Sequence, residues 1–195
     1  MKVVLASGNR KKLAELSAIL QPLGWELIPQ GVLGVQECAE PFDSFIENAL
    51  VKARHAAQQT GLPALADDSG LCVDALLGAP GVLSARYAGE PCSDENNNRK
   101  LLEALTGEAN RRARFVCAIA YVRHAKDPQP IIAEGEWVGD ILEKPCGTGG
   151  FGYDPLFFVK AYGCTSAELD AATKNRHSHR GEALKNFVAR LQERV

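Results

Sequence analysis

The chain has 195 residues, of which 46% are hydrophobic and 24% are charged, and its formal net charge is -2 at pH 7. This size and composition are typical of one globular domain, or of one domain with two lobes, that can bury about 70% of its unfolded surface. The nearly neutral charge argues against a polymeric nucleic-acid partner, although a local basic patch can still hold a small anion.

The cysteines and the amino-terminal segment bear on the cellular compartment. The six cysteines are scattered and include no C-x-x-C pair, which argues against a structural zinc site and favours free thiols in a reducing cytoplasm. The segment MKVVLASGNRKK turns polar after a very short apolar stretch, so it resembles neither a signal peptide nor a transit peptide. No apolar run approaches the roughly 20 residues that a spanning helix needs. We therefore expect a soluble cytoplasmic protein with no membrane partner.

The first third of the chain alternates predicted strands and helices. Short apolar or β-branched runs predict strands, and apolar residues at helical spacing predict helices. In chain order, we expect a strand over residues 2–6, a helix over 10–20 with its end marked by Gly24, a strand over 25–29, a loop over 30–41, and a helix capped by Asp43 or Ser44 and ended by Gly61.

The rest of the chain adds longer strands. Residues 63–68 predict a strand that the GLCVDAL segment either continues or follows with a new one. After that we expect an ordered loop over 78–91, a helix capped by Asp94 that runs to about Leu105, two long strands over 112–124 and 130–142 joined by a hairpin turn, a glycine-rich loop over 144–158, a short helix near 166–171 and an amphipathic helix over 180–195.

This order of elements indicates the fold class. Helices alternate with strands early and a hairpin comes later, which predicts an α/β protein with a mixed β-sheet rather than a purely parallel one. We expect helices on the faces of the sheet and a cleft where loops from several strands meet.

The segment SGNRKK places a glycine turn before the first predicted helix. Free backbone N–H groups and the positive end of the helix dipole suit an anion there, and Lys12 lies one turn into the helix, within reach of a phosphate. The alternative is a well-capped surface helix with solvated basic side chains, since Ser and Asn are ordinary capping residues.

The segment ADDSG places two carboxylates at the end of an apolar run. In a strand, Asp67 and Asp68 point to opposite faces and so serve different environments. A carboxylate at the carboxyl end of a strand suits a Mg²⁺ ion that also holds phosphate oxygens. The alternative is an Asp-Ser-Gly turn that leaves the strand.

The segment GTGGFGYDP contains a match to the dinucleotide-binding pattern G-x-G-x-x-G. We discount this match, and with it a dehydrogenase, because Pro155 and an aromatic run follow where a helix should open. The glycines favour close approach of the backbone to a ligand, with Phe151 or Tyr153 available to stack on a base, and an ordinary flexible loop is the alternative.

The segment KNRHSHRGEAL groups hydrogen-bond donors before and at the start of the last helix. His177 and His179 suggest a metal site only weakly, because neighbouring Lys and Arg side chains repel a cation. Lys174, His179 and Arg180 instead suit an anion or the carbonyl edge of a base. Ser178 is also a good capping residue, and the two roles are compatible.

Five motifs in order, SGNRKK, FIENALVKA, ADDSGL, GGFGYDPLF and SHRGEAL, resemble those of the Ham1/RdgB family of non-canonical purine nucleoside triphosphate pyrophosphatases. Each motif is weak alone, but together they cover essentially the whole chain. The resemblance implies one two-lobed domain over 1–195 with a long twisted mixed sheet, a central substrate cleft and a homodimer. It also implies Mg²⁺-dependent hydrolysis of ITP, dITP and XTP to the monophosphate and pyrophosphate, which removes deaminated purines from the nucleotide pool.

The resemblance also assigns roles to individual residues. Asp68 would be the catalytic base and a metal ligand, Glu40 a second metal ligand, and Ser69 a substrate contact. The family often has Thr where Ser7 stands, and the stretch AEPFDSF around Glu40 departs from the family pattern. The remaining substrate contacts would be Ser7, Gly8, Asn9, Arg10, Lys11 and Lys12 for the triphosphate, Phe151, Gly152, Tyr153 and Asp154 for the base and sugar, and Lys174, His179 and Arg180 for the purine.

Two other functions remain open at this stage. One is a pyrophosphatase for other modified nucleotides, and the other is a regulatory module that binds a nucleotide without cleaving it. Paired Asp67 and Asp68 beside a basic segment favour hydrolysis, because binding alone gains little from an extra carboxylate near phosphates.

Overall fold

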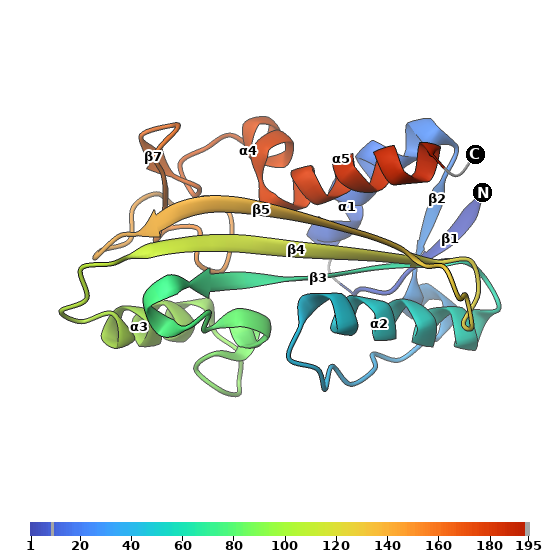
Figure 1. The fold of residues 1–195 in the computed structure, drawn as a ribbon, viewed down its shortest axis with the longest axis horizontal. Coiled ribbons are helices and arrows are strands. Elements are labelled where there is room, and N and C mark those ends of the chain that lie inside the picture. The colour runs from blue at the N-terminus through green and yellow to red at the C-terminus, as the bar shows by residue number, and fades with distance from the viewer. Residues whose placement is uncertain (9, 194–195) are drawn as a thin grey trace. The chain divides into compact units, whose positions relative to one another are not determined.

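The computed structural model of the protein describes residues 1–8 and 10–193 (Figure 1). Its strands are β1 (Lys2–Leu5), β2 (Glu26–Pro29), β3 (Ala64–Val73), β4 (Arg112–Val122), β5 (Ile131–Ile141), β6 (Phe157–Val159) and β7 (Cys164–Thr165). Its α-helices are α1 (Arg10–Leu20), α2 (Phe45–Thr60), α3 (Asp94–Ala104), α4 (Ala171–His177) and α5 (His179–Gln192). Short 3₁₀ helices are η1 (Gln21–Leu23), η2 (Gln30–Leu33), η3 (Asp74–Leu76) and η4 (Gly81–Arg86).

The strands form a seven-stranded sheet in the order β2-β1-β3-β4-β5-β6-β7. The sheet is mixed, because β1 pairs in parallel with β2 and β3 whereas β6 pairs antiparallel with β5 and β7. The prediction of an α/β protein with a mixed sheet flanked by helices is confirmed. Within the described ranges, no helix combines the length and apolar character needed to cross a bilayer.

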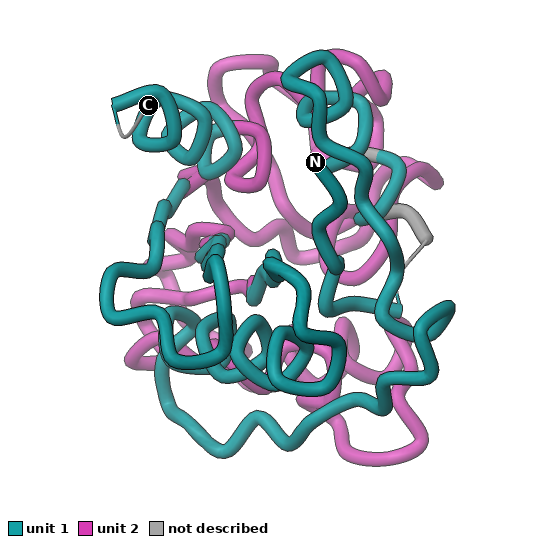
Figure 2. The backbone as a smooth tube through the Cα atoms, turned by 90° about the vertical axis from the view of Figure 1, so that its right-hand side faces the viewer, with its two compact units in different colours: residues 1–68, 117–135, 182–195 teal, residues 69–116, 136–181 magenta. Residues whose placement is uncertain are grey.

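The chain divides into two compact units, which Figure 2 shows in different colours. Unit 1 comprises residues 1–68, 117–135 and 182–195, and unit 2 comprises residues 69–116 and 136–181. The boundary in the first long strand falls between Asp68 and Ser69, so these consecutive residues belong to different units. The expectation that residues 1–195 form one two-lobed domain stays a prediction.

The core of unit 1 follows the period-two alternation of its strands. Val3, Leu5 and Leu65 pack in one hydrophobic cluster with side chains of α1 and α5. Ala64 and Ala66 pack in another cluster with the alanines of α2. Successive side chains of a strand point to opposite faces, so consecutive residues of β3 meet different helices.

The core of unit 2 is aromatic. The ring of Phe115 lies 4.5 Å from that of Phe157, and the ring of Trp137 lies 5.6 Å from it, measured between centroids. Leu101 and Leu105 from the α3 segment pack in the same cluster.

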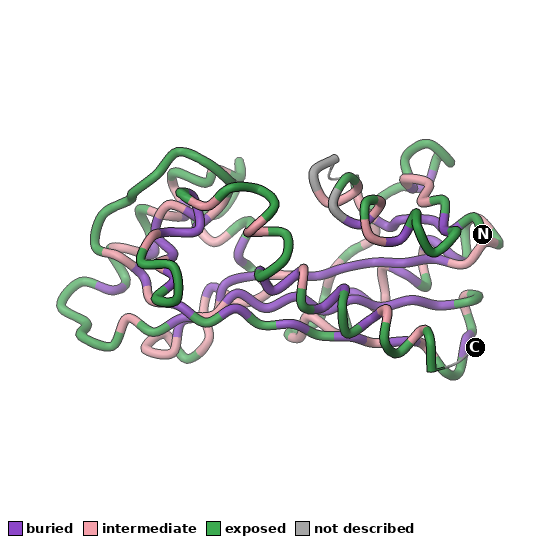
Figure 3. The backbone as a smooth tube through the Cα atoms, turned by 90° about the horizontal axis from the view of Figure 1, so that it is seen from above, coloured by how far each residue is buried: buried purple, intermediate pink, exposed green. Residues whose placement is uncertain are grey.

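Figure 3 shows that the buried positions concentrate on the strands, as expected for a sheet covered by helices.

Helix α2 begins and ends where the sequence indicates. The hydroxyl of Ser44 accepts a hydrogen bond from the Glu47 amide at 3.3 Å, and Gly61 takes a left-handed conformation just after the helix. Ser44, rather than Asp43, is therefore the capping residue. The GLCVDAL segment continues β3 instead of starting a new strand.

Two predicted boundaries are wrong. Ser93 caps α3 by accepting from the Asn96 amide at 3.3 Å, so Asp94 is the first residue of the helix and not its cap. The short helix expected near 166–171 begins at Ala171, because Asp170 accepts from the Thr173 amide at 2.9 Å and starts the helix there. In addition, η2 lies in the predicted loop over 30–41 and η4 in the predicted loop over 78–91.

A buried aspartate, Asp127, stabilises the connection between β4 and β5. The Asp127 carboxylate, whose side chain is almost fully buried, accepts from the amides of Arg123 and Gln129, each at 2.9 Å, and from the Arg123 guanidinium. Chiefly through the Arg123 side chain, these donors lower the pKa of Asp127 well below its ordinary value. A depressed pKa stabilises the folded state above the unfolded pKa of about 4, and this stability is lost as the pH falls further.

We expect Asp127→Asn to lower the free energy of unfolding at pH 7 by about 1–3 kcal/mol, because it weakens the hydrogen bonds that the buried Asp127 side chain accepts. The difference from the parent protein should shrink as the pH falls below about 4, since Asp127 then binds a proton in the unfolded chain while it stays ionised in the folded protein. Urea denaturation between pH 7 and pH 2.5 measures both effects. Glu26→Gln, at an exposed site on β2, is the control. A difference that stays constant with pH would contradict this prediction.

Candidate active site

The tandem aspartates of β3 are directed to different helices. The Lys12 ammonium of α1 lies 2.8 Å from the Asp67 carboxylate, and the Lys52 ammonium of α2 lies 2.9 Å from the Asp68 carboxylate. Asp67 is 2% exposed and Asp68 is 8% exposed. The prediction that the two carboxylates point to opposite faces is confirmed, and each buried charge has a lysine as its counter-ion.

Lys52 joins Asp68 to a second carboxylate. Its ammonium also lies 3.3 Å from Glu40, so one cation contacts both of the predicted metal ligands. Burial by itself lowers the pKa of Lys52, but the nearby Asp68 and Glu40 carboxylates outweigh it and raise the pKa above its ordinary value. Lys52 is therefore a permanent positive charge at this position.

Lys52 is a site residue that we did not predict, although the sequence carries a signal for it. Ala49, Ala53 and Ala56 form the buried stripe of α2. Lys52 lies three residues after Ala49 and four before Ala56, so it shares their face of the helix. A lysine within an apolar stripe needs a buried partner, and Asp68 is that partner.

Asp68 has features that suit both a base and a ligand for a hard cation. Burial is the main cause that raises the pKa of its carboxyl group, with Lys52 opposing and Glu40 adding to the shift. One carboxylate oxygen, Oδ2, is buried and has no hydrogen-bond partner among residues 1–8 and 10–193. A buried carboxylate oxygen without a donor is unfavourable, so the site favours a cation or a polarised water at this atom.

The residues present fit a magnesium ion that is shared with a substrate. Mg²⁺ prefers oxygen ligands and usually takes one or two protein carboxylates, with waters and phosphate oxygens as the rest. Across the described ranges, no group of three or more His, Cys, Asp or Glu side chains could hold a metal by itself. Asp68 and Glu40 match the smaller set that a metal bound together with a triphosphate requires.

The amino-terminal turn is described in part. Ser7 is half-buried and Gly8 is exposed, and a side chain at Gly8 would lie 3.3 Å from the Glu37 carboxylate. Asn9 and the side chains of Arg10 and Lys11 lie outside the described part of the chain. Lys12, one of the predicted triphosphate contacts, forms an ion pair with Asp67 of the tandem aspartates.

In unit 2, Asp154 organises the glycine loop, which we define as residues 147–152. Its carboxylate accepts from the Phe151 amide at 2.8 Å and from the Ser166 hydroxyl at 2.8 Å, and it forms an ion pair with Lys174. Gly150 has a φ of +74°, and a Cβ atom there would collide with the Asp154 carboxylate. Asp154 therefore fixes the loop.

These contacts present an aromatic ring at the surface. The Phe151 side chain is 39% exposed, and the Lys174 ammonium lies 5.1 Å from the centroid of its ring. An exposed ring on a fixed backbone suits stacking on a planar base. By contrast, Tyr153 is 4% exposed and its hydroxyl donates to the Ser84 carbonyl at 2.8 Å, so its side chain anchors the loop.

His179 and Arg180 lie at the start of α5, and both are buried. The His179 ring stacks on Phe115, with centroids 4.9 Å apart and planes 17° from parallel. The Arg180 guanidinium donates to the Ser69 hydroxyl at 3.3 Å. His177 is exposed whereas His179 is buried, which argues against a shared metal site.

The sequence profile of the Ham1 family matches residues 3–190 of the chain. The chain belongs to the Ham1 family. It is 60% identical over 192 residues to a protein of Nitrosomonas europaea named dITP/XTP pyrophosphatase. The aligned residues cover 98% of this chain and 95% of that protein. Among solved structures, a HAM1 protein from Coxiella burnetii has a TM-score of 0.95 and 49% identity and covers 99% of both chains. A dITP/XTP pyrophosphatase from Mycobacterium abscessus has a TM-score of 0.80 and 43% identity over 98% of this chain and 100% of that one.

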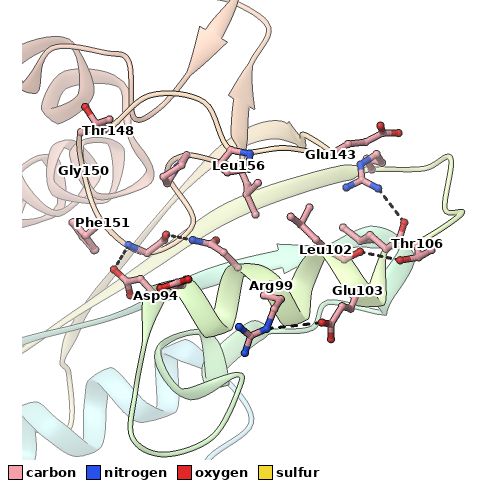
Figure 4. A pocket seen from close by; sticks show the side chains of 18 of the residues that line it. Asp94, Arg99, Leu102, Glu103, Thr106, Glu143, Thr148, Gly150, Phe151 and Leu156 are labelled. Atoms are coloured by element: carbon pink, nitrogen blue, oxygen red, sulfur yellow. Dashed lines mark hydrogen bonds and ion pairs between the residues drawn. The ribbon is translucent and has the colours of Figure 1, made fainter.

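The Ham1 chain also has a cavity of about 860 Å³ in unit 2, between α3 and the glycine loop (Figure 4). Its walls combine apolar side chains with the charged residues Asp94, Glu95, Arg99, Glu103, Arg111 and Glu143. Lys174, His179 and Arg180 are not among its lining residues. Since the carboxylates in this lining outnumber the two arginines and like charges repel, we do not assign the cavity to the triphosphate.

The predicted site residues therefore form two described groups. In unit 1, Lys12 and Glu40 join the tandem aspartates, with Lys52 added by the structure. In unit 2, Ser69 joins Arg180, and the glycine loop joins Asp154 and Lys174. The substrate and metal roles that the resemblance gives to these residues stay predictions.

Proposed function

We propose that this Ham1 protein hydrolyses non-canonical purine nucleoside triphosphates, namely dITP, XTP and ITP, to the nucleoside monophosphate and pyrophosphate. The observation that carries the proposal is Asp68, a buried carboxylate with one oxygen lacking a hydrogen-bond partner among the described residues, linked through Lys52 to Glu40. This arrangement lies in a chain 60% identical to a protein named dITP/XTP pyrophosphatase.

Unit 1 would carry out the hydrolysis. Asp68 orients the attacking water and accepts its proton, while the water oxygen bonds to the α-phosphorus and the bond to the bridging oxygen of the β-phosphate breaks. A raised pKa makes Asp68 a stronger base than an ordinary carboxylate. Lys52 keeps Asp68 and Glu40 in place. A Mg²⁺ ion on these carboxylates would neutralise charge on the pyrophosphate leaving group.

Unit 2 would select the base. Hypoxanthine and xanthine carry a carbonyl oxygen at C6, where adenine carries an amino group. Donors from Lys174, His179 and Arg180 would pair with the carbonyl, whereas the adenine amino group would leave these donors unpaired. Discrimination built on buried polar groups can reach about 10⁴-fold. Phe151 would stack on the purine ring.

We also infer a homodimer and a cytoplasmic location. The location is supported by the thiols, because all six cysteines lie in the described ranges and are free. The homodimer rests on the family resemblance.

A pyrophosphate-release assay tests the proposal directly. With Mg²⁺ present, we expect dITP, XTP and ITP to be cleaved at least 100-fold faster than ATP, and chelation by EDTA should abolish release. Preference for ATP would overturn the proposed selectivity. Binding of dITP without release of pyrophosphate would instead indicate a regulatory module, and preference for a modified pyrimidine would indicate a different pyrophosphatase.

A further inference from the structure

Two side chains of α3 hold one peptide group of the glycine loop. The Gly152 amide donates to the Asp94 carboxylate at 2.7 Å, and the Asn98 side-chain amide donates to the Gly152 carbonyl at 2.9 Å (Figure 4). Asp94 and Asn98 are four residues apart and so lie on the same face of the helix. Both backbone polar groups of Gly152 are thereby bound to a rigid element of unit 2.

These bonds are not needed to build α3. Ser93 already caps the helix, so the Asp94 carboxylate is not its capping group. The Oδ1 atom of Asn98 is buried and has no hydrogen-bond partner within residues 1–8 and 10–193. Leaving that acceptor unpaired has a free-energy cost, and Asn is a mediocre helix former. The orientation of Asn98 therefore serves Gly152 and not the helix.

The held peptide adjoins the exposed ring of the loop. Gly152 directly follows Phe151 and has a φ of +60°. Asp154 fixes the Phe151 amide, so the backbone is bound on both sides of the Phe151 carbonyl. The cavity of about 860 Å³ is lined by Asp94, Asn98 and Gly152. Without the two bonds, the loop has room to shift into this space.

We propose that Asp94 and Asn98 are positioning residues that hold the Gly152 peptide and thereby fix Phe151 for stacking on the purine. The inference deepens the proposed function and rests on it. Neither residue takes part in the chemical step. Asp94 and Asn98 would raise the affinity for the substrate by ordering the loop in the unliganded protein, because a loop that is already fixed loses less conformational freedom when the substrate binds.

The experiment compares Asp94→Ala, Asn98→Leu and Asp94→Asn with the parent protein. With dITP, we expect Asp94→Ala and Asn98→Leu each to raise KM about tenfold and to change kcat less than twofold. A tenfold change in KM corresponds to about 1.4 kcal/mol, which is the typical contribution of one hydrogen bond. Asp94→Asn keeps an acceptor oxygen and should recover most of the affinity. Arg99→Ala is the matched control, since Arg99 lines the same cavity but its side chain bonds to Asn96 and pairs with Glu103 in its own helix.

A second readout needs no substrate. Amide hydrogen exchange in the unliganded protein should show Gly152 protected in the parent and in Arg99→Ala, and at least tenfold less protected in Asp94→Ala. Urea denaturation identifies any variant that has lost its fold. Leu is chosen at position 98 because its side chain has nearly the volume of Asn and so leaves no void.

The outcomes separate the two proposals. Unchanged Gly152 protection in Asp94→Ala, or lost protection with an unchanged KM, would overturn the positioning inference. A loss of kcat without a change in KM would overturn it as well. If the parent protein releases no pyrophosphate from any purine triphosphate, the proposed function fails, and the exchange measurement still decides whether Asp94 and Asn98 hold the loop.

Discussion

Replacing Asp68 with Asn should slow pyrophosphate release from dITP by about 10²–10⁴-fold, the range typical for loss of a general base. The amide has the same shape as the carboxylate but cannot accept a proton from water, and it binds a hard cation poorly. We expect the fold to persist, because the Asn oxygen can still accept from Lys52, and Glu40 remains 3.3 Å from the same ammonium. Steady-state kinetics at saturating Mg²⁺ measures the loss, and urea denaturation checks the fold.

Asp140→Asn is the matched control for this change. Asp140 is also a strand aspartate with a lysine partner, since Lys160 lies 2.8 Å from it, and it belongs to neither group of site residues. It should retain nearly full activity. If Asp68→Asn kept more than a tenth of the parent rate, Asp68 could not be the base, and the proposed mechanism would fail.

Replacing Lys12 with Met should lower the free energy of unfolding by about 3–5 kcal/mol, because it removes the lysine that pairs with the buried Asp67 carboxylate at 2.8 Å. Asp67 is 2% exposed, so water cannot replace the ammonium. The double variant Lys12→Met/Asp67→Asn removes the buried charge as well and should recover most of the lost stability. Urea denaturation of the three proteins gives these differences.

The double variant also separates the two roles of Lys12. If Lys12 binds phosphate, the double variant should be stable but have a KM for dITP at least tenfold above that of the parent. Lys160→Met is the control for stability, because Lys160 is the same 2.8 Å from its aspartate but its side chain is 77% exposed. Exposed ion pairs contribute about 0–1 kcal/mol. Equal destabilisation by Lys12→Met and Lys160→Met would show that burial of Asp67 does not matter.

Much of the fold follows from local rules that can be applied to the sequence. The apolar runs predict the long strands, and Ser44 with Gly61 delimits α2 because capping depends on residues that are neighbours in the chain. The same rules miss β6 and β7, which are too short to show a pattern. They also favour Asp94 as a cap although Ser93, one residue earlier, takes that role.

The sequence by itself determines that Asp67 and Asp68 serve opposite faces, because the alternation of side chains along a strand is a local property of the backbone. It also determines that Lys52 shares the buried face of α2, since helical spacing is local too. Only the tertiary structure decides which lysine meets which aspartate, and that Asn98 binds a peptide 54 positions away along the chain. Such pairings depend on how separate elements pack together, and no periodicity along the chain encodes that packing.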